Sequence, residues 1–229
     1  MRYRFLVVFC FFILVSVFLS SCILEGPSNS NSGVFSSDFL VDDFNVFDDN
    51  NWIRLSEYMS FSQLKPDNVF VSNGNLIFMI PQNSTSSGGI SSKYRFPRGD
   101  FSVSFKSTNN DNSVFDFVLY NSANSVKFFV RFKYESSELS NFVEYGIESS
   151  YTNYTSTNYV TPSYSYHEIK ISVFNDSVIY YFDNSQIWYL SFDSVPSELY
   201  VKILSYLNDS TSYFYDRFIF VDKFSYQKR

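Results

Sequence analysis

YSYHEIKISVFNDSVIYYFDNSQIW, the stretch from Tyr164 to Trp188, decides the fold. Apolar and polar side chains alternate along it, as in the segment HEIKISV, and this two-residue period is typical of β-strands with one buried face. Asn-Asp-Ser at 175–177 and Asp-Asn-Ser at 183–185 interrupt the alternation, and these residue types form turns. The stretch therefore predicts three successive strands joined by short turns.

The same period continues on both sides of this stretch, from Phe39 onward. FSVSFKS (Phe101–Ser107) and SVKFFVRFK (Ser125–Lys133) are clear examples, and no long segment after the N-terminal region has a helical period. Aromatic residues make up 21% of the chain, and aromatic side chains suit the pleated, half-buried surface of a strand. Many short strands in one domain predict an all-β fold, a sandwich or a barrel.

The N-terminus has the layout of a signal peptide. Arg2 and Arg4 precede the apolar run Phe5–Phe18, and the small residues of Leu-Ser-Ser-Cys follow at 19–22. Leu-Ser-Ser-Cys resembles the bacterial lipobox, which implies that Cys22 receives a lipid and becomes the new N-terminus. A plain signal peptide or an uncleaved anchor is the alternative. We expect an exported protein, anchored by lipid to the bacterial cell envelope or surface.

These features divide the chain into three parts. Residues 1–21 are the predicted lipoprotein signal peptide, and residues 22–37, rich in Ser and Asn, are a predicted flexible tether. Residues 38–229 have the length of one domain. The chain has two cysteines, and since Cys10 lies in the segment to be removed, no internal disulfide can form after export.

The charge of the chain disfavours some classes of binding partner. Lys and Arg number 17 against 23 Asp and Glu, and removal of Arg2 and Arg4 leaves 15 basic against 23 acidic residues, a net charge of −8. Such an acidic domain is a poor nucleic-acid binder, and its charge opposes adhesion to anionic lipid. The single His167 excludes a site built from several histidines.

Five segments follow one another along the chain: FNVFDDNNW (Phe44–Trp52), PDNVFVSNGNLIFMI (Pro66–Ile80), SGGISSKYRFPRGDFSVSFKS (Ser87–Ser107), the stretch Tyr164–Trp188 quoted above and FVDKFSYQ (Phe220–Gln227). In this order they resemble family-16 glycoside hydrolases, the laminarinase and lichenase group. The resemblance implies a concanavalin-like jelly roll, two curved antiparallel sheets with a polysaccharide or cell-wall glycan bound on the concave one. Lectin-like lipoproteins with the same sandwich share some of these motifs but have different sites.

The resemblance to this family makes two carboxylates candidates for catalysis. The family carries Glu-x-Asp-x-Glu on one strand, and a retaining glycosidase places its nucleophile and its acid/base about 5–5.5 Å apart. EYGIE offers Glu144 and Glu148, but Gly146 stands where the family has Asp. A glycine inside a strand indicates a bulge or a close backbone approach.

Strand order leads to a different position for the catalytic strand. In the family, about two strands separate the catalytic strand from the strand that begins here at His167. Counting back past YTNYTSTNYV and NFVEYGIE reaches SVKFFVRFK, where Lys127, Phe129 and Arg131 take the places of the three acidic residues. We therefore expect hydrolytic activity to be lost. An active β-glucan hydrolase using Glu144 and Glu148 and a structural or adhesive lipoprotein without a glycan site are the alternatives.

Aromatic residues are candidates for glycan contact, since sugar rings stack on aromatic faces. The candidates are Trp52, Tyr134, Tyr145, Tyr154 and Trp188. The resemblance also implies a structural calcium held by the Asp222 carboxylate and the backbone at Gly74, although an exposed Asp and a turn glycine explain both residues as well. No other cofactor is expected.

Overall fold

The computed structural model describes residues 33–107, 112–134, 141–150, 152–160, 165–210 and 214–229. Within these ranges the chain forms β-strands and one 3-10 helix, η1 (Pro66–Asn68), and none of its helices is long and apolar enough to cross a membrane. The signal peptide expected at residues 1–21 and the lipidated Cys22 lie outside the described residues.

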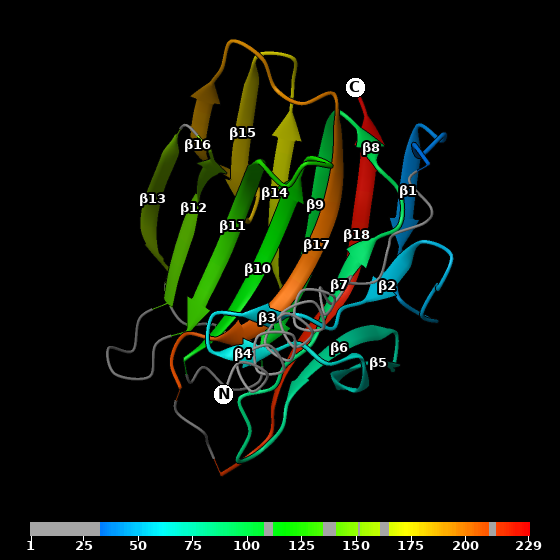
Figure 1. Cartoon of the computed structure of the whole chain (residues 1–229), viewed down its shortest axis with the longest axis vertical. Helices are drawn as coiled ribbons and strands as arrows, with labels where there is room; N and C mark the ends of the chain where they lie inside the picture. Colours follow the sequence, from blue (N-terminus) through cyan, green and yellow to red (C-terminus); the bar gives the residue numbers. More distant parts are fainter. Residues whose placement is uncertain (1–32, 108–111, 135–140, 151, 161–164, 211–213) are drawn as a thin grey trace, which may run out of the picture. The chain divides into compact units, whose positions relative to one another are not determined.

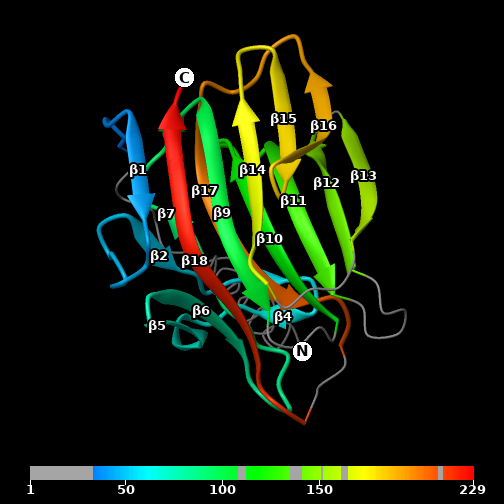
Figure 2. The same ribbon diagram turned by 180° about the vertical axis from the view of Figure 1, so that it is seen from behind.

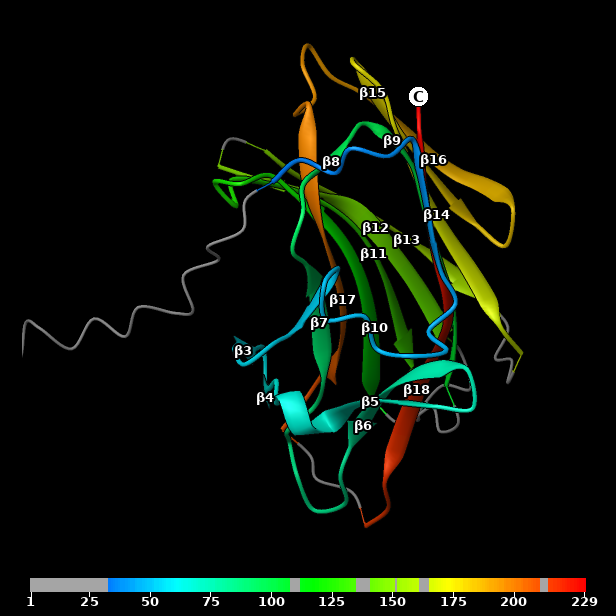
Figure 3. The same cartoon turned by 90° about the vertical axis from the view of Figure 1, so that its right-hand side faces the viewer.

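Two antiparallel sheets of eight strands each form the domain (Figures 1–3). The cleft sheet, in front in Figure 1, contains in order β13 (Asn153–Val160), β12 (Asn141–Ser149), β11 (Val126–Tyr134), β10 (Ser113–Tyr120), β17 (Glu198–Leu207), β7 (Gly89–Ser92) and β2 (Trp52–Arg54), with β8 (Phe96–Pro97) on β17. The back sheet, in front in Figure 2, contains β16 (Ser185–Ser191), β15 (Ser177–Phe182), β14 (His167–Val173), β9 (Gly99–Ser107), β18 (Arg217–Lys228), β6 (Asn75–Ile80) and β5 (Val69–Ser72), with β1 (Phe39–Asp42) on β18. The predicted all-β jelly-roll sandwich is confirmed.

Residues 167–191 form three neighbouring strands of the back sheet, as the alternation from 164 to 188 predicts. Strands β14, β15 and β16 follow each other in the chain and pair antiparallel in the same order. Asp183 and Asn184 have positive φ values of 48° and 63°, a conformation that Asn and Asp adopt more readily than most residues. The Asp-Asn turn chemistry therefore sets the β15–β16 hairpin.

The main core lies between the two sheets and consists largely of aromatic rings. On β9, Phe101, Val103 and Phe105 are buried, while the residues between them are partly exposed. The ring of Phe105 stacks on Phe115 of the cleft sheet, with centroids 4.0 Å apart and planes 10° from parallel. Burying one such side chain contributes about 1.5–3 kcal/mol, and Phe105→Ala would cost about 3–5 kcal/mol.

A second, smaller apolar cluster covers part of the opposite face of the cleft sheet. Its buried members are Leu64, Val114, Val118, Phe129, Leu204 and Tyr206. The short hairpin of β3 (Tyr58–Met59) and β4 (Ser62–Gln63) contributes Met59 to it, and the Leu207 N–H donates to Ser62 Oγ at 2.9 Å. The hairpin is thereby attached over one part of this face and leaves the rest open.

The packed domain begins before residue 38, where the sequence analysis placed its start. The Phe35 N–H donates to the Arg95 carbonyl at 2.8 Å, and the Arg95 N–H donates to the Gly33 carbonyl at 3.1 Å. The Phe35 ring packs 4.9 Å from Phe96. Residues 33–35 therefore belong to the sandwich, and the predicted tether is shorter at its C-terminal end.

Candidate functional site

The open face of the cleft sheet contains a cleft of about 170 Å³. It is lined by Glu57, Met59, Asp116, Val118, Tyr120, Asn124, Lys127, Phe129, Arg131, Glu148, Lys202 and Leu204. These residues come from β3 and the residue before it, from strands β10, β11, β12 and β17, and from the turn between β10 and β11. Three cations and three carboxylates therefore surround an apolar floor.

Strand β11 presents Lys127 and Arg131 to this cleft because alternate residues of a strand point to opposite faces of the sheet. Phe128, Val130 and Phe132 are buried toward the main core, so Lys127 and Arg131 point to the open face. Strands β12 and β13 are the two strands between β11 and β14, which confirms the strand count made from the sequence. In the order of the sheet, β11 lies beside the middle strand β10 and β12 lies one strand farther out.

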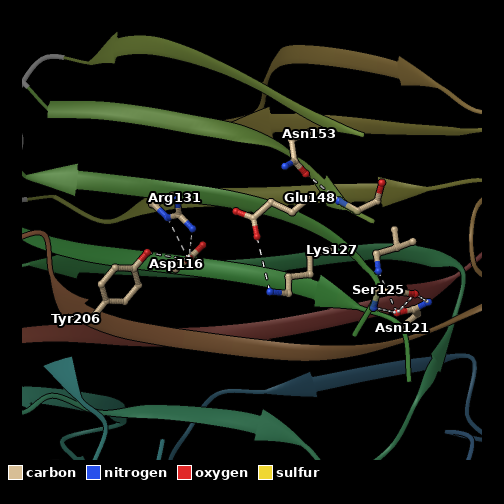
Figure 4. Close-up of polar contacts among 10 residues, drawn as sticks. Asp116, Asn121, Ser125, Lys127, Arg131, Glu148, Asn153 and Tyr206 are labelled. Carbon is tan, nitrogen blue, oxygen red and sulfur yellow. Dashed lines mark hydrogen bonds and ion pairs between the residues drawn. The ribbon is translucent and has the colours of Figure 1, made fainter. Parts of the chain in front are cut away.

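Arg131 joins three strands through ion pairs. Its Nε and Nη2 atoms donate to Asp116 Oδ2 at 3.2 and 3.0 Å, and its Nη1 donates to Glu144 Oε2 at 3.2 Å. The Tyr206 hydroxyl donates to the same Asp116 oxygen at 3.1 Å (Figure 4). Burial raises the pKa of the Asp116 carboxyl, while the charge and donors of Arg131 oppose that rise.

Glu144 faces the open side of β12 but is held by two cations of β11. Its Oε2 atom accepts from Arg131 and from Lys133 Nζ at 2.7 Å. Burial alone would raise its pKa, but the hydrogen bond from Lys133 and the charge of Arg131 outweigh burial and hold the pKa below its ordinary value. Glu144 is therefore stabilised as a carboxylate within an ion-pair network.

Glu148 also faces the open side, and it lies opposite Lys127 in the sheet register. Its Oε2 atom is 3.7 Å from Lys127 Nζ, and more than a third of each side chain is exposed (Figure 4). Residues four apart on a strand have Cα atoms separated by roughly 13 Å. Glu144 and Glu148 thus share a face, and each carboxylate lies beside a cation of the neighbouring strand β11 rather than beside the other carboxylate.

Gly146, midway between them, has no room for a side chain. A Cβ atom at this position would lie 2.2 Å from the Tyr154 carbonyl oxygen and 3.2 Å from the Phe129 ring. The Tyr180 hydroxyl of the back sheet donates to the Gly146 carbonyl at 2.8 Å and holds this backbone in place. The close backbone approach predicted for this glycine is present, and β12 cannot accommodate the middle Asp of the family pattern.

Three of the aromatic candidates lie in the core and offer no surface to a glycan. Trp52 is 1% exposed and donates its Nε1 hydrogen to Asp42 Oδ2 at 2.7 Å. Tyr134 and Tyr145 are also buried between the sheets. Their proposed contact with glycan is corrected, because alternation on β11 and β12 turns both rings away from the open face.

The other two aromatic candidates lie outside the cleft. Trp188 on β16 is partly buried, with its ring 5.4 Å from that of Tyr145. Tyr154, 57% exposed on the edge strand β13, lines a second groove of about 410 Å³. The groove also contains Phe128, Ile147, Leu190 and Phe192, and it opens between β11–β13 and the end of β16.

The residues that would hold a structural calcium form a sparse site. Asp222 is exposed beside a register shift in β18, and Gly74 is in a turn with a φ of 69°. Among the described residues, no group of three or more His, Cys, Asp or Glu is placed to hold a metal ion. One carboxylate and one turn are a sparse set of ligands for calcium.

Asp116, the most buried charged group of the cleft, was not among the candidates drawn from the sequence. The sequence does mark this residue, because Asp116 is the only charged residue in the largely apolar strand SVFDFVLY. Glu57 and Lys202 were missed for another reason. They are far apart in the chain and are joined only by the fold, with Lys202 Nζ 2.8 Å from Glu57 Oε1.

Solved structures of two glucanases and a carrageenase resemble this sandwich along most of its length. The catalytic domain of a laminarinase from Thermotoga petrophila matches with a TM-score of 0.70 and 13% identity, over 83% of this chain and 97% of that one. The β-glucanase of Bacillus licheniformis matches with 0.69 and 14%, over 85% and 100%. The κ-carrageenase of Pseudoalteromonas carrageenovora, solved with an oligotetrasaccharide of κ-carrageenan, matches with 0.64 and 14%, over 82% and 93%.

The chain has the fold of these enzymes. No protein-family model and no curated protein sequence matches it. At such low identity the likeness establishes the jelly-roll architecture, and the activity has to be argued from the residues of the cleft.

Proposed function

We propose that this protein is an exported, lipid-anchored glycan-binding protein whose glucanase-like sandwich no longer hydrolyses polysaccharide. The observation that carries the proposal is the composition of β11, where Lys127, Phe129 and Arg131 occupy the open face. The resemblance places two acids and a middle Asp at these positions. Two cations and a phenyl ring supply neither a nucleophile nor a proton donor for a glycosidic bond.

The state of the two glutamates supports loss of hydrolysis. A retaining mechanism needs one ionised and one protonated carboxyl converging on the same bond. Glu144 is bound by Arg131 and Lys133, and Glu148 lies beside Lys127. The pKa of Glu144 is held below its ordinary value, and cations of β11 contact both carboxylates that would have to converge on a glycosidic bond.

One observation favours the alternative of an active β-glucan hydrolase. Glu144 and Glu148 lie on the same face of β12, and Glu148 lines the cleft. A different observation favours a structural or adhesive role without a glycan site. The cleft volume of about 170 Å³ is below the roughly 300–1,000 Å³ of ordinary small-molecule sites.

A binding experiment separates these functions. The full-length protein, purified from membranes in detergent, is tested by affinity electrophoresis against neutral and acidic polysaccharides. Retarded migration in at least one polysaccharide, without shortening of that polymer, is the expected result. Binding to none of them would leave the structural or adhesive role.

The lipid anchor is tested separately. In the expected outcome, cells incorporate labelled palmitate into the protein, and Cys22→Ser abolishes the label and releases the protein from the membrane fraction. The matched substitution Cys10→Ser leaves both unchanged, because Cys10 lies in the segment that we propose is removed. Equal membrane retention of Cys22→Ser would contradict lipid anchoring.

A further inference from the structure

The two oxygens of the Asp116 carboxylate are treated differently by the fold. Oδ2 accepts three hydrogen bonds, two from Arg131 and one from Tyr206. Oδ1 accepts none from any described residue, although the residue is only 1% exposed. An unpaired buried acceptor is costly, and such a group in a native structure calls for an explanation.

Asp116 lies where a bound ligand would contact the protein. It is on β10, the middle strand of the cleft sheet, and it lines the cleft together with Lys127, Phe129 and Glu148. Figure 4 shows its carboxylate beside Arg131 and Tyr206, with Lys127 and Glu148 farther along the cleft. The same donors that hold Oδ2 therefore fix the orientation of Oδ1.

The cations of the cleft are already paired with carboxylates, whereas Asp116 Oδ1 still lacks a hydrogen-bond donor among the described residues. The cation Lys202 is paired with Glu57 at 2.8 Å, and Arg131 is paired with Asp116 and Glu144. Lys127 lies 3.7 Å from Glu148. An acidic ligand would meet Asp116 as a like charge, whereas the hydroxyl group of an uncharged ligand can donate a hydrogen bond to Oδ1.

We propose that Asp116 Oδ1 anchors a hydroxyl group of an uncharged sugar, and that the cleft discriminates against uronic and sulfated sugars. This inference rests on the proposed function, because it names the class of glycan and the residue that selects it. The small cleft volume indicates that one sugar ring is held at a time. Arg131 and Tyr206 are positioning residues, since they act through the Asp116 carboxylate.

Access to Oδ1 requires a movement at the rim of the cleft. Lys127 and Glu148 are exposed by 36% and 42% and form the longest ion pair within the cleft. Exposed side chains of this kind change rotamer in picoseconds to nanoseconds, so the rim can open without rearrangement of the sheet. The sugar would then displace a weak surface pair rather than the buried Arg131–Asp116 pair.

Asp116→Asn is a sharp test because the fold dictates how the amide is oriented. Three donors converge on the Oδ2 position, so the Asn oxygen takes that place and the NH₂ group points to the cleft. The substitution thus changes a charged acceptor into a donor at nearly constant volume. Asp100→Asn is the matched control, since Asp100 forms an arginine pair with Arg229 on the back sheet, outside the cleft.

Isothermal titration of the full-length protein uses laminarihexaose, cellohexaose and mannohexaose as neutral probes, and hexagalacturonate and a κ-carrageenan hexasaccharide as acidic ones. The wild type should bind at least one neutral probe tenfold or more tightly than either acidic probe. Asp116→Asn should weaken that binding about tenfold or more, the size expected for a hydrogen bond to a charged group. Asp100→Asn should bind as the wild type does.

A ligand-side measurement keeps the inference testable if Asp116→Asn fails to fold. Fluorine replaces each hydroxyl of the bound sugar in turn, which removes the donor while nearly preserving size, and at least one position should lose binding tenfold or more. Binding of no probe by the wild type overturns the proposed function and this inference with it. Equal or tighter binding of an acidic probe, an unaffected Asp116→Asn, or a fluorinated series without any loss overturns this inference alone.

Discussion

Arg131 on β11 donates to Asp116 on β10 through two nitrogens, and both hydrogen bonds, at 3.2 and 3.0 Å, end on the same oxygen. The position at which the resemblance expects a catalytic glutamate thus holds a guanidinium that neutralises a buried carboxylate. Burial by itself would lower the pKa of Arg131, but the neighbouring Asp116 carboxylate raises it above its ordinary value. The centre of the cleft is therefore an ion-pair network rather than an acid/base pair.

Removal of this guanidinium should destabilise the protein strongly. Arg131→Leu leaves Asp116 buried without its cation, and breaking a buried pair in this way costs about 3–5 kcal/mol of unfolding free energy. Urea denaturation followed by circular dichroism measures the loss. The control Arg229→Leu removes an arginine from a more exposed pair with Asp100 and should cost about 1 kcal/mol or less. Equal losses in the two variants would contradict a buried network at Arg131.

A side chain at position 146 should disrupt the pairing of β12 with β13. In Gly146→Ala the new methyl group collides with the Tyr154 carbonyl oxygen, and overpacking of this kind costs about 1–3 kcal/mol. Gly33→Ala is the matched control, because its methyl group would make only ordinary contacts of 3.5 Å with Tyr94. If both variants unfold at the wild-type urea concentration, the crowding around Gly146 is not as described.

The ion pairs of Glu144 should make stability depend on pH. The pKa of Glu144 in the folded protein lies below its ordinary value, so the carboxylate stabilises the fold above about pH 4.5 and loses this contribution as the pH falls through the folded pKa. Between pH 7 and pH 3 the unfolding free energy of the wild type should fall more than that of Glu144→Gln. The difference between the two proteins at pH 7 should be about 1 kcal/mol. Parallel pH profiles would contradict this assignment.

The two tryptophans should respond differently to solvent. Trp52 is 1% exposed, whereas Trp188 is only partly buried, so acrylamide should quench the emission of Trp188→Phe, which retains Trp52, much less than that of Trp52→Phe. Addition of a bound glycan should leave the emission of Trp188→Phe unchanged. A strong glycan-induced change there would place the sugar against Trp52 and contradict its burial.

The alternation of apolar and polar residues predicted the all-β architecture, because it determines which side of a strand is buried. The Asp-Asn turn of the β15–β16 hairpin and the order of β11 to β14 could be deduced from the chain alone. Alternation also carries the information that Tyr134 and Tyr145 face inward, since Phe132 and Val143 of the same parity are apolar. Their selection as glycan contacts rested on residue type, which does not distinguish a core ring from a platform.

Contacts between distant segments account for what the sequence could not predict. The Glu57–Lys202 pair and the cover provided by the β3–β4 hairpin depend on how the hairpin folds back over the sheet. The crowding at Gly146 depends on the Tyr154 carbonyl of the next strand. The attachment of Phe35 to Arg95 likewise joins the end of a Ser-rich segment to a loop 60 positions later.

The release of reducing ends from laminarin and from mixed-linkage β-glucan tests the central claim most directly. The wild type should release no more reducing ends than Glu144→Gln, Glu148→Gln or a blank, while it still binds a glycan. Release above the blank that disappears in both glutamine variants would contradict the loss of hydrolysis, because it would show that Glu144 and Glu148 act as a catalytic pair despite their ion pairs with β11.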